Sequence, residues 1–597
     1  MRASLLALAL LLLTAATAAG ATPITYTPTP GLPQFEGAAV DPQPIAAPLP
    51  PQHPFMAPNE RSNLHVDAYQ TDANPLTGPL GHDPSVLSTM QTADCASVTF
   101  DSHGRIVTVC VGVARPTLTM FDATTLDTLA TYPLPERQPS VPGGGGTIFN
   151  DFAGGGYFYL DGQDRAIVPT TTRHVLVVKA TDDPGFQLEH DYDLTGAVPS
   201  GDKIISALPD WKGNLWFAST KGVMGTVDMT SGAVKSFDTG EPNGNSFAVD
   251  DDGGVYVVTD KALYRFEAAA DGTPKVVWRE VYDNTGEQKP GQAQHGSGTT
   301  PTVMDGGLVS ITDNADPMDV VVYRRGRQVS GSRLVCKQPV FQKGASASDN
   351  SLNVAGRSIL VENNYGYTGP DAVTNGKTTS PGVERVDIDR DGQGCRRVWH
   401  SDEVSPTVVP KLSLGAGLMY VYTKPPNQTG GADGCYLTGL DFRTGATRFR
   451  RLTGEGIGYN NNYAPVTIGP DGTAYVGTLG GLVAVRDATP PPQGLGASGG
   501  AMDDRLDGTK PRLALRLRRL TRARVRVTVT GADRAHLRRA EFRIGNRRGA
   551  LDRRAPFAAT LSLRRLDRRR AHTLRVAVRL DDGTHATLKR ALRPKRR

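Results

Sequence analysis

A repeating strand pattern is the feature that most limits how this chain can fold. Between Asp94 and Asp487 the same unit returns at intervals of roughly 40 to 55 residues. Each unit begins with a short apolar strand and a turn that contains Gly or Asp, and two or three further strands follow. Periods of this length are typical of β-propellers and other repeat arrays, in which neighbouring units bury one another's sheet faces.

The residues inside each unit favour strands over helices. Apolar residues alternate with small or polar ones in runs such as Ser246–Phe266 and Ala464–Asp487, which is the period of a β-strand. D-G, G-N and G-G pairs separate the runs and suit tight hairpins because Gly accepts a positive φ. No window between residues 90 and 490 shows a sustained helical period. We therefore expect an all-β fold, an eight-bladed β-propeller, with seven blades as the alternative.

Eight unit starts can be identified, and the last unit is one strand short. Its strands end before Pro490, so we expect the segment around His65–Tyr69 to supply a fourth strand and close the ring, which removes exposed sheet edges. The predicted starts lie near Ser97, Tyr157, Lys203, Ser246, Pro301, Ser351, Thr407 and Pro465.

The regions outside the repeat have distinct compositions. Residues 1–21 combine Arg2, the apolar run Leu5–Leu13 and small residues to Ala21, the pattern of a cleaved signal peptide. The apolar run is shorter than the about 20 residues that span a bilayer. We expect a secreted or extracellular protein, with association with the cell surface as an option, and no transmembrane segment. Residues 22–60 are a Pro-rich extended arm, 61–488 the propeller, 489–510 a linker, and 511–597 a basic domain.

Charge divides the chain in two. The whole chain has 66 Lys and Arg against 60 Asp and Glu, a net charge of +6. Residues 501–597 hold 30 basic and 9 acidic residues, a net charge of +21, whereas the remainder holds 36 and 51, a net charge of −15. The basic segments lack interleaved aromatic residues, so we do not expect a nucleic-acid partner. An anionic cell-envelope polymer is the expected partner of the C-terminal domain.

Two resemblances follow from the motifs. The runs Pro465–Thr478, Leu440–Phe449 and Val386–Trp399 resemble the repeat of the quinoprotein alcohol dehydrogenase-like propellers, in which an aromatic ring of the outer strand packs between blades. Pyrroloquinoline quinone is not expected, because the chain has no adjacent cysteine pair and only 4 Trp. In this chain, the outer-strand aromatic position of the quinoprotein-like repeat is occupied by Tyr132, Phe237, Trp278, Trp399 and Phe449.

Residues 511–597, with runs such as R-V-R-V-T-V-T, are similar to bacterial Ig-like domains, which implies a small β-sandwich.

Five cysteines are present, and export permits disulfides. Cys95 and Cys110 flank a hairpin whose turn lies near His103, which places the two side chains across adjacent strands. Cys336 and Cys395 are expected to bridge neighbouring blades, which leaves Cys435 free. Sequence alone does not determine the pairing.

Candidate site residues gather in loops that share one face of a propeller, where ligands usually bind. Glu362, Asp313 and Asn350 offer oxygen ligands for Ca²⁺ or another divalent cation, although Asn and Asp also serve turn geometry. His295 precedes an inner strand and is a candidate general base, although a lone loop His is more often only exposed. The candidate ligand-binding residues are Asn350, Asn363, Tyr365, Lys221, Lys261, Lys424 and Asn462.

Two functions remain open from the sequence. The first is a binding protein that captures a small molecule or a polysaccharide on the channel face, while the basic domain attaches the chain to the cell envelope. The alternative is a metal-dependent extracellular hydrolase, lactonase or lyase; a quinone-dependent oxidoreductase is less well supported. Whether the chain is an enzyme, and which cofactor it holds, stays undetermined at this point.

Overall fold

The structure is a computed structural model that describes residues 30–494, apart from 113–114, 139–148, 150 and 390–391, and residues 513–592, apart from 522, 532–533, 535–536, 545–546, 565, 567–571 and 581–584. Contacts divide the chain into two compact units, Met1–Ala501 and Met502–Arg597. The predicted signal peptide and most of the predicted linker lie outside the described residues.

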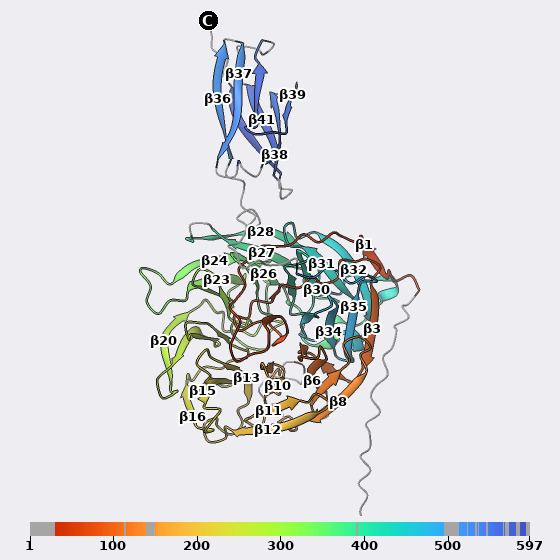
Figure 1. The fold of residues 1–597 in the computed structure, drawn as a ribbon, viewed down its shortest axis with the longest axis vertical. Helices are drawn as coiled ribbons and strands as arrows, with labels where there is room; N and C mark the ends of the chain where they lie inside the picture. Colours follow the sequence, from red (N-terminus) through yellow and green to blue (C-terminus); the bar gives the residue numbers. More distant parts are fainter. Residues whose placement is uncertain are drawn as a thin grey trace, which may run out of the picture. The chain divides into compact units, whose positions relative to one another are not determined.

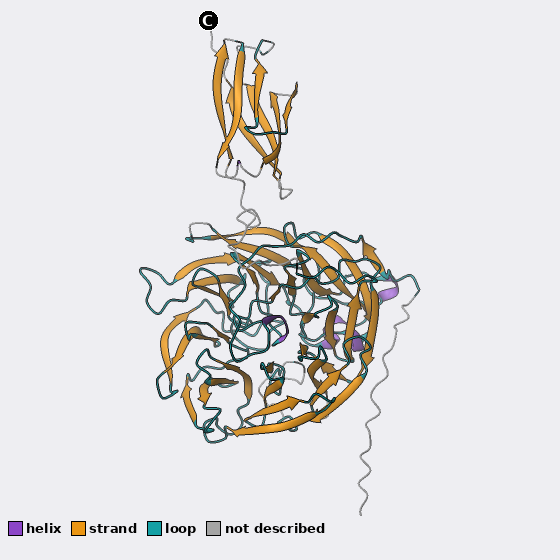
Figure 2. Ribbon diagram, viewed as in Figure 1, coloured by secondary structure: helices purple, strands orange, loops and turns teal. Residues whose placement is uncertain are grey.

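The first unit is built from antiparallel sheets that follow one another along the chain (Figures 1 and 2). The first sheet holds β4 (Ala93–Cys95), β5 (Thr99–Phe100), β6 (Ile106–Gly112), β7 (Thr117–Phe121) and β8 (Thr128–Pro133). The second holds β9 (Tyr159–Leu160), β10 (Arg165–Pro169), β11 (His174–Ala180) and β12 (Phe186–Asp193); the third holds β13 (Ile204–Pro209), β14 (Leu215–Ser219), β15 (Val223–Val227) and β16 (Val234–Asp238).

The next three sheets keep this four-stranded order. The fourth holds β17 (Ala248–Val249), β18 (Val255–Val258), β19 (Ala262–Ala268) and β20 (Pro274–Val281). The fifth holds β21 (Thr302–Met304), β22 (Leu308–Thr312), β23 (Asp319–Arg324) and β24 (Leu334–Pro339). The sixth holds β25 (Asn353–Ala355), β26 (Ser358–Glu362), β27 (Val383–Ile388) and β28 (Cys395–Ser401).

N-terminal strands complete the last two sheets. The seventh holds β29 (Lys411–Ser413), β30 (Leu418–Thr423), β31 (Gly434–Asp441) and β32 (Thr447–Glu455), with β2 (Ala73–Asn74) at its inner edge and β1 (Phe35–Gly37) at its outer edge. The eighth holds β33 (Val466–Ile468), β34 (Ala474–Thr478), β35 (Gly481–Arg486) and β3 (Ser85–Met90). The described helices of this unit are 3₁₀ turns: η1 (Asn59–Arg61), η2 (Pro370–Val373), η3 (Thr429–Gly431) and η4 (Ile457–Tyr459).

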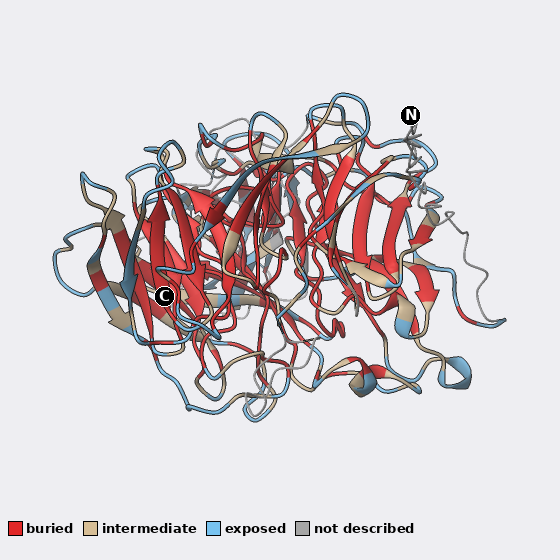
Figure 3. Ribbon diagram, turned by 90° about the horizontal axis from the view of Figure 1, so that it is seen from below, coloured by how far each residue is buried: buried red, intermediate tan, exposed pale blue. Residues whose placement is uncertain are grey.

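The sheets stand around a common centre, which makes the fold propeller-like (Figure 1). Each of the predicted unit starts lies just before an innermost strand, and β34 and β35 of the last sheet contact β4 of the first. Apolar side chains of neighbouring sheets share their cores: Val107 and Val168 pack together between the first two sheets, for example. Figure 3 shows most strands buried, whereas outer strands and many connecting loops are exposed or half-buried. The all-β, propeller-like fold that the repeat predicts is confirmed.

The eighth sheet is completed by β3, which pairs with β35 from Ser85 opposite Arg486 to Met90 opposite Gly481. An N-terminal strand therefore closes this sheet, as predicted, but the segment around His65–Tyr69 was the wrong choice. Those residues belong to Ser62–Asn74, here called the central segment, which lies in the middle of the ring (dark red in Figure 1).

The central segment runs along the inner edges of the sheets, and its last two residues form β2. Its carbonyl groups accept hydrogen bonds from backbone N–H groups of five different sheets, and its residues are buried. Because these contacts follow the ring, the segment fills the centre. The bonds run from Leu160 to Ser62, from Val249 to Ala68, from Val303 to Tyr69, from Val354 to Thr71 and from Leu412 to Asp72.

Covalent and aromatic contacts tie the strands together. Cys95–Cys110 links β4 to β6, and Cys336–Cys395 links the outer strands of the fifth and sixth sheets, so both predicted disulfides are confirmed; Cys435 is free and buried. The Trp399 indole, in the predicted aromatic slot, donates a 2.9 Å hydrogen bond to the Phe442 carbonyl of the seventh sheet.

The second unit has two sheets that share one core. One holds β36 (Leu513–Thr521), β37 (Arg524–Gly531) and β40 (Ala558–Ser562); the other holds β39 (Arg547–Asp552), β38 (Leu537–Ile544), β41 (His572–Leu580) and β42 (His585–Leu592). Val527 of the first sheet and Phe542 of the second are fully buried in that core, whereas Arg526 is exposed. Among all described residues, no helix has the length and apolar character that crossing a bilayer requires.

Candidate functional site

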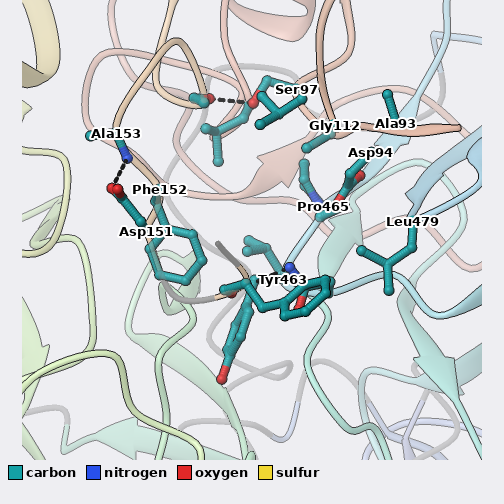
Figure 4. Close-up of a pocket in the computed structure, with 18 of the residues that line it drawn as sticks. Ala93, Asp94, Ser97, Gly112, Asp151, Phe152, Ala153, Tyr463, Pro465 and Leu479 are labelled. Carbon is teal, nitrogen blue, oxygen red and sulfur yellow. Dashed lines mark hydrogen bonds between the residues drawn. The ribbon is translucent and has the colours of Figure 1, made fainter. Parts of the chain in front are cut away.

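A cavity of about 380 Å³ opens among the loops that precede innermost strands and the inner ends of the first and eighth sheets (Figure 4). A volume of this size suits a small organic molecule. Its wall includes Asp94, Asp151, Asp349, Phe152 and Tyr463. The sequence predicted ligand binding on these loops, and Asn462 is the predicted ligand-binding residue that lines this cavity.

Aromatic rings form one wall. Tyr463 packs edge-to-face on Phe152, with ring centroids 5.1 Å apart, and on Tyr367 at 5.4 Å. Asn462 and Tyr463 both have positive φ, 38° and 69°, a conformation that costs non-glycine residues of order 1–3 kcal/mol each. The Tyr463 hydroxyl donates to the Gly291 carbonyl at 3.3 Å, which helps to hold this turn. A strained turn thus places the Tyr463 ring at the cavity.

Asp151 is the one cavity carboxylate that lies between two cations. Lys203 Nζ lies 2.5 Å from Asp151 Oδ2, and Arg137 Nη2 lies 3.3 Å from the same oxygen. Arg137 also donates to the Asp151 carbonyl at 2.5 Å. The negative charge of Asp151 is therefore more than neutralised by the two neighbouring cations.

Asp94 has no such partner among the described residues. It lies on β4, which the Cys95–Cys110 disulfide holds against β6. Its Oδ1 is buried and makes no hydrogen bond. Burial raises the pKa of Asp94 well above its ordinary value of 3.8, because a charged carboxylate loses its hydration there. A cationic partner beside Asp94 would oppose this shift.

Asp349 is the second carboxyl group without a cation among the described residues. Its side chain accepts one hydrogen bond, from the Ala293 backbone at 3.1 Å. Burial raises the pKa of Asp349 to about 7, although the Ala293 hydrogen bond opposes the shift. The Asp349 backbone N–H donates to Asn364 Oδ1 at 2.8 Å, which anchors the residue from behind.

Glu362 holds the Asn364 side chain that anchors Asp349. Its carboxyl accepts from Asn350 Nδ2 at 2.7 Å and from Asn364 Nδ2 at 2.9 Å. Burial raises the pKa of Glu362 to about 8. Glu362 and Asn350 therefore belong to a buried network behind Asp349, in which they position the Asp349 loop.

The other predicted ligand-binding residues have varied surroundings. Asn363 is buried and holds the backbone of its own loop, for example by donating to the Ala345 and Pro381 carbonyls at 3.0 Å. Lys424 is buried and paired with Asp433 at 2.9 Å. Tyr365 is half-buried, and Lys221 and Lys261 are exposed.

His295 is exposed, and its Nδ1 lies 3.3 Å from the Gly286 carbonyl oxygen. No hydrogen bond to a carboxylate orients its ring within the described part of the chain. The geometry therefore adds nothing to the prediction of a general base.

The predicted metal ligands fall into two groups. Asp313 lies with Asp283 and Asp319 in a cluster of carboxylates, to which Glu362 does not belong. Glu362 and Asn350 are instead hydrogen bonded to each other. None of the three clustered carboxylates lines the cavity, so the cluster does not supply a metal for hydrolysis there.

Asp94 and Arg137 are cavity residues that sequence reasoning missed. Asp94 precedes a disulfide cysteine within a strand that alternates weakly, and Arg137 follows the outer strand β8. The signal that the sequence offered for Asp94 was an ionisable residue next to a cysteine that was predicted to form a disulfide. That signal does not show which way the side chain points.

No family model matches the chain. An uncharacterized protein of Archaeoglobus fulgidus is 30% identical over 325 residues, which span 49% of this chain and 62% of that protein. The chain thus covers less than two thirds of this relative.

Similar solved structures share little sequence with the chain. Saccharomyces cerevisiae Sqt1 has a TM-score of 0.40 and 9% identity, over 64% of this chain and 94% of that one. PorZ of Porphyromonas gingivalis has a TM-score of 0.33 and 15% identity, over 83% and 62%. A Bacteroides fragilis protein provisionally named 6-phosphogluconolactonase has a TM-score of 0.33 and 12% identity, over 58% and 94%.

Proposed function

We propose that this chain is a secreted, eight-bladed β-propeller that binds a small organic cation in the cavity lined by Asp94 and Asp349. The eight successive sheets and the contact of the last with the first support the blade number. Two disulfides support export, because disulfides persist in oxidising compartments.

The observation that carries the proposal is a pair of carboxyl groups that lie beside an aromatic wall and have no cationic partner among the residues that the structure describes. Asp151 is the contrasting case, because the basic side chains of Arg137 and Lys203 both lie next to its carboxylate. Within the described parts of the chain, no basic side chain pairs with Asp94 or Asp349. An ammonium group would restore their charged forms, and aromatic faces such as that of Tyr463 attract cations.

Calorimetric titration of the full chain with a panel of arylalkylamines, which are protonated at neutral pH, and with their neutral and carboxylate analogues, tests the proposal. Only the amines should bind. Asp94→Asn or Asp349→Asn should weaken amine binding by about 2 kcal/mol or more, since each removes a buried charge pair. Asp183→Asn changes an exposed carboxylate outside the cavity and should leave binding unchanged. Preference for the carboxylate analogues would contradict the proposal.

The pH dependence gives a second readout of the same experiment. The free Asp349 carboxyl has a pKa of about 7, and a bound ammonium lowers that pKa, so binding releases a proton below pH 7. Affinity should therefore rise as the pH increases towards about 8 and then level off. Asp349→Asn should flatten this profile.

In this proposal the second unit is a small Ig-like β-sandwich, which attaches the chain to the cell envelope by binding an anionic polymer. Arg518 lies directly opposite Arg526, and Arg575 directly opposite Lys589, and all four side chains are exposed. Like charges in opposed strand positions repel each other. A polyanion along these faces would relieve that repulsion.

A further inference from the structure

Three aspartates from two neighbouring sheets converge outside the cavity. Asp283 follows β20 of the fourth sheet, whereas Asp313 and Asp319 flank the loop between β22 and β23 of the fifth. One carboxylate oxygen of each lies within 4.8 Å of the others. The sequence separates Asp283 from Asp313 by a long loop and the two strands β21 and β22, so the fold creates this cluster.

The cluster has acceptors without donors. Asp313 is fully buried, and its Oδ1 accepts from the backbone of Ala315 at 3.1 Å and of Asp319 at 2.8 Å. In the described part of the chain, no N–H or O–H group donates a hydrogen bond to its buried Oδ2 or to the buried Oδ1 of Asp319. A buried carboxylate oxygen without a donor is costly. A cation would satisfy both oxygens together.

The local charges leave room for a divalent ion. Lys337 Nζ lies 2.5 Å from Asp283 Oδ2, and the lysine is 28% exposed, so it has space to move away. Three carboxylates and one ammonium give a net charge of −2. Asp316 and Lys289 lie close by and add one charge of each sign, which leaves the net value unchanged.

We infer that Asp283, Asp313 and Asp319 bind a divalent cation of the hard, oxygen-preferring class, with Ca²⁺ as the best match. Carboxylate oxygens and water complete such a site. The ion would join the end of β20 to the β22–β23 loop and so link two sheets. It would compete with Lys337 for Asp283. This site is independent of the proposed cavity ligand.

Titration of the chelator-treated full chain with CaCl₂ at constant ionic strength tests the inference. Saturable binding and a raised melting temperature are expected. Asp313→Asn keeps an oxygen for the two backbone hydrogen bonds but removes the charge, and it should weaken Ca²⁺ binding at least about tenfold. Asp305→Asn, an exposed carboxylate in the turn of the same sheet, should bind as the unaltered chain does.

Lys337→Gln provides a variant that acts in the opposite direction. It removes the competing ammonium, so Ca²⁺ should bind several-fold more tightly. Equal Ca²⁺ affinity in the Asp313→Asn and Asp305→Asn variants would overturn the inference, as would the absence of saturable binding in the unaltered chain. Weaker binding in Lys337→Gln would also overturn it, because the lysine would then be supporting the site.

Discussion

At the residue scale, Glu362 shows how burial turns a carboxyl group into a neutral network member. In the unfolded chain its pKa has the ordinary value of 4.5, and in the fold its pKa is about 8. Between these values the folded state binds more protons than the unfolded state. The stability contributed by this group is therefore fully present below about pH 4.5 and declines until about pH 8.

Glu362→Gln should remove that decline. The amide keeps an acceptor for Asn350 and carries no titrating proton. The free energy of unfolding of the unaltered chain should fall with pH by up to about 1.4 kcal/mol per unit more steeply than that of the variant. Urea unfolding of both proteins at pH 5, 6, 7 and 8 measures the difference. Glu287→Gln, at an exposed position, is the matched control, and identical slopes in all three proteins would contradict the prediction.

At the residue scale, the sequence predicted only part of the candidate site. The loops around Asn350 and Glu362 are richer in polar residues than turns require, and this excess predicted ligand binding on their face of the propeller. It did not identify the cavity, because Asp94, Asp349 and Tyr463 come from three distant parts of the chain. Their convergence depends on how the ring closes, which is a tertiary property.

At the element scale, the central segment is the part of the fold that the strand pattern did not predict. A period-two pattern identifies strands that have one apolar face. The central segment instead buries polar side chains, among them His65, Asp67 and Asp72. Such residues are normally exposed, so the pattern hides their burial. β3, in contrast, has an ordinary half-buried pattern and lies at the outside.

Lys411 makes that burial possible. Its ammonium is hydrogen bonded to the Asp72 carboxylate and to the Leu64 carbonyl, and both charged side chains are buried. Although burial alone would raise the pKa of Asp72, Lys411 and His65 bring it below the ordinary value. The Asp72 carboxylate is thus ionised only because its partners are present.

Lys411→Met should destabilise the first unit by about 3–5 kcal/mol, because the buried Asp72 carboxylate loses its ammonium partner and keeps only the hydrogen bonds with His65 and Ser351 among its described side-chain contacts. Adding Asp72→Asn should recover part of that loss. Thermal and urea unfolding measure both effects. Lys343→Met removes an exposed lysine and should change stability by less than about 0.5 kcal/mol. If the two lysine variants are equally stable, the central segment does not depend on this pair.

At the scale of the whole molecule, the two units carry opposite charge, which the sequence already shows. The repeat also predicted the all-β, propeller-like fold, because turn residues and alternation are local properties. The sandwich adds what composition cannot show: basic side chains face one another across strands, as Arg518 and Arg526 do. Alternation in R-V-R-V places arginine outside and valine inside.

This arrangement makes retention of the full chain on immobilised heparin, a sulfated polysaccharide, a direct test of the attachment role. The chain should bind at low salt and elute as salt screens the arginines. The double variant Arg518→Gln and Arg526→Gln should elute at lower salt.

The matched control is the double variant Lys235→Gln and Lys275→Gln, which removes the same charge from exposed positions of the first unit. It should elute as the unaltered chain does. Equal shifts in both double variants would show that net charge alone, and not the paired arginines of the sandwich, drives binding. Tighter retention on double-stranded DNA than on heparin would contradict the expectation that nucleic acid is not the partner.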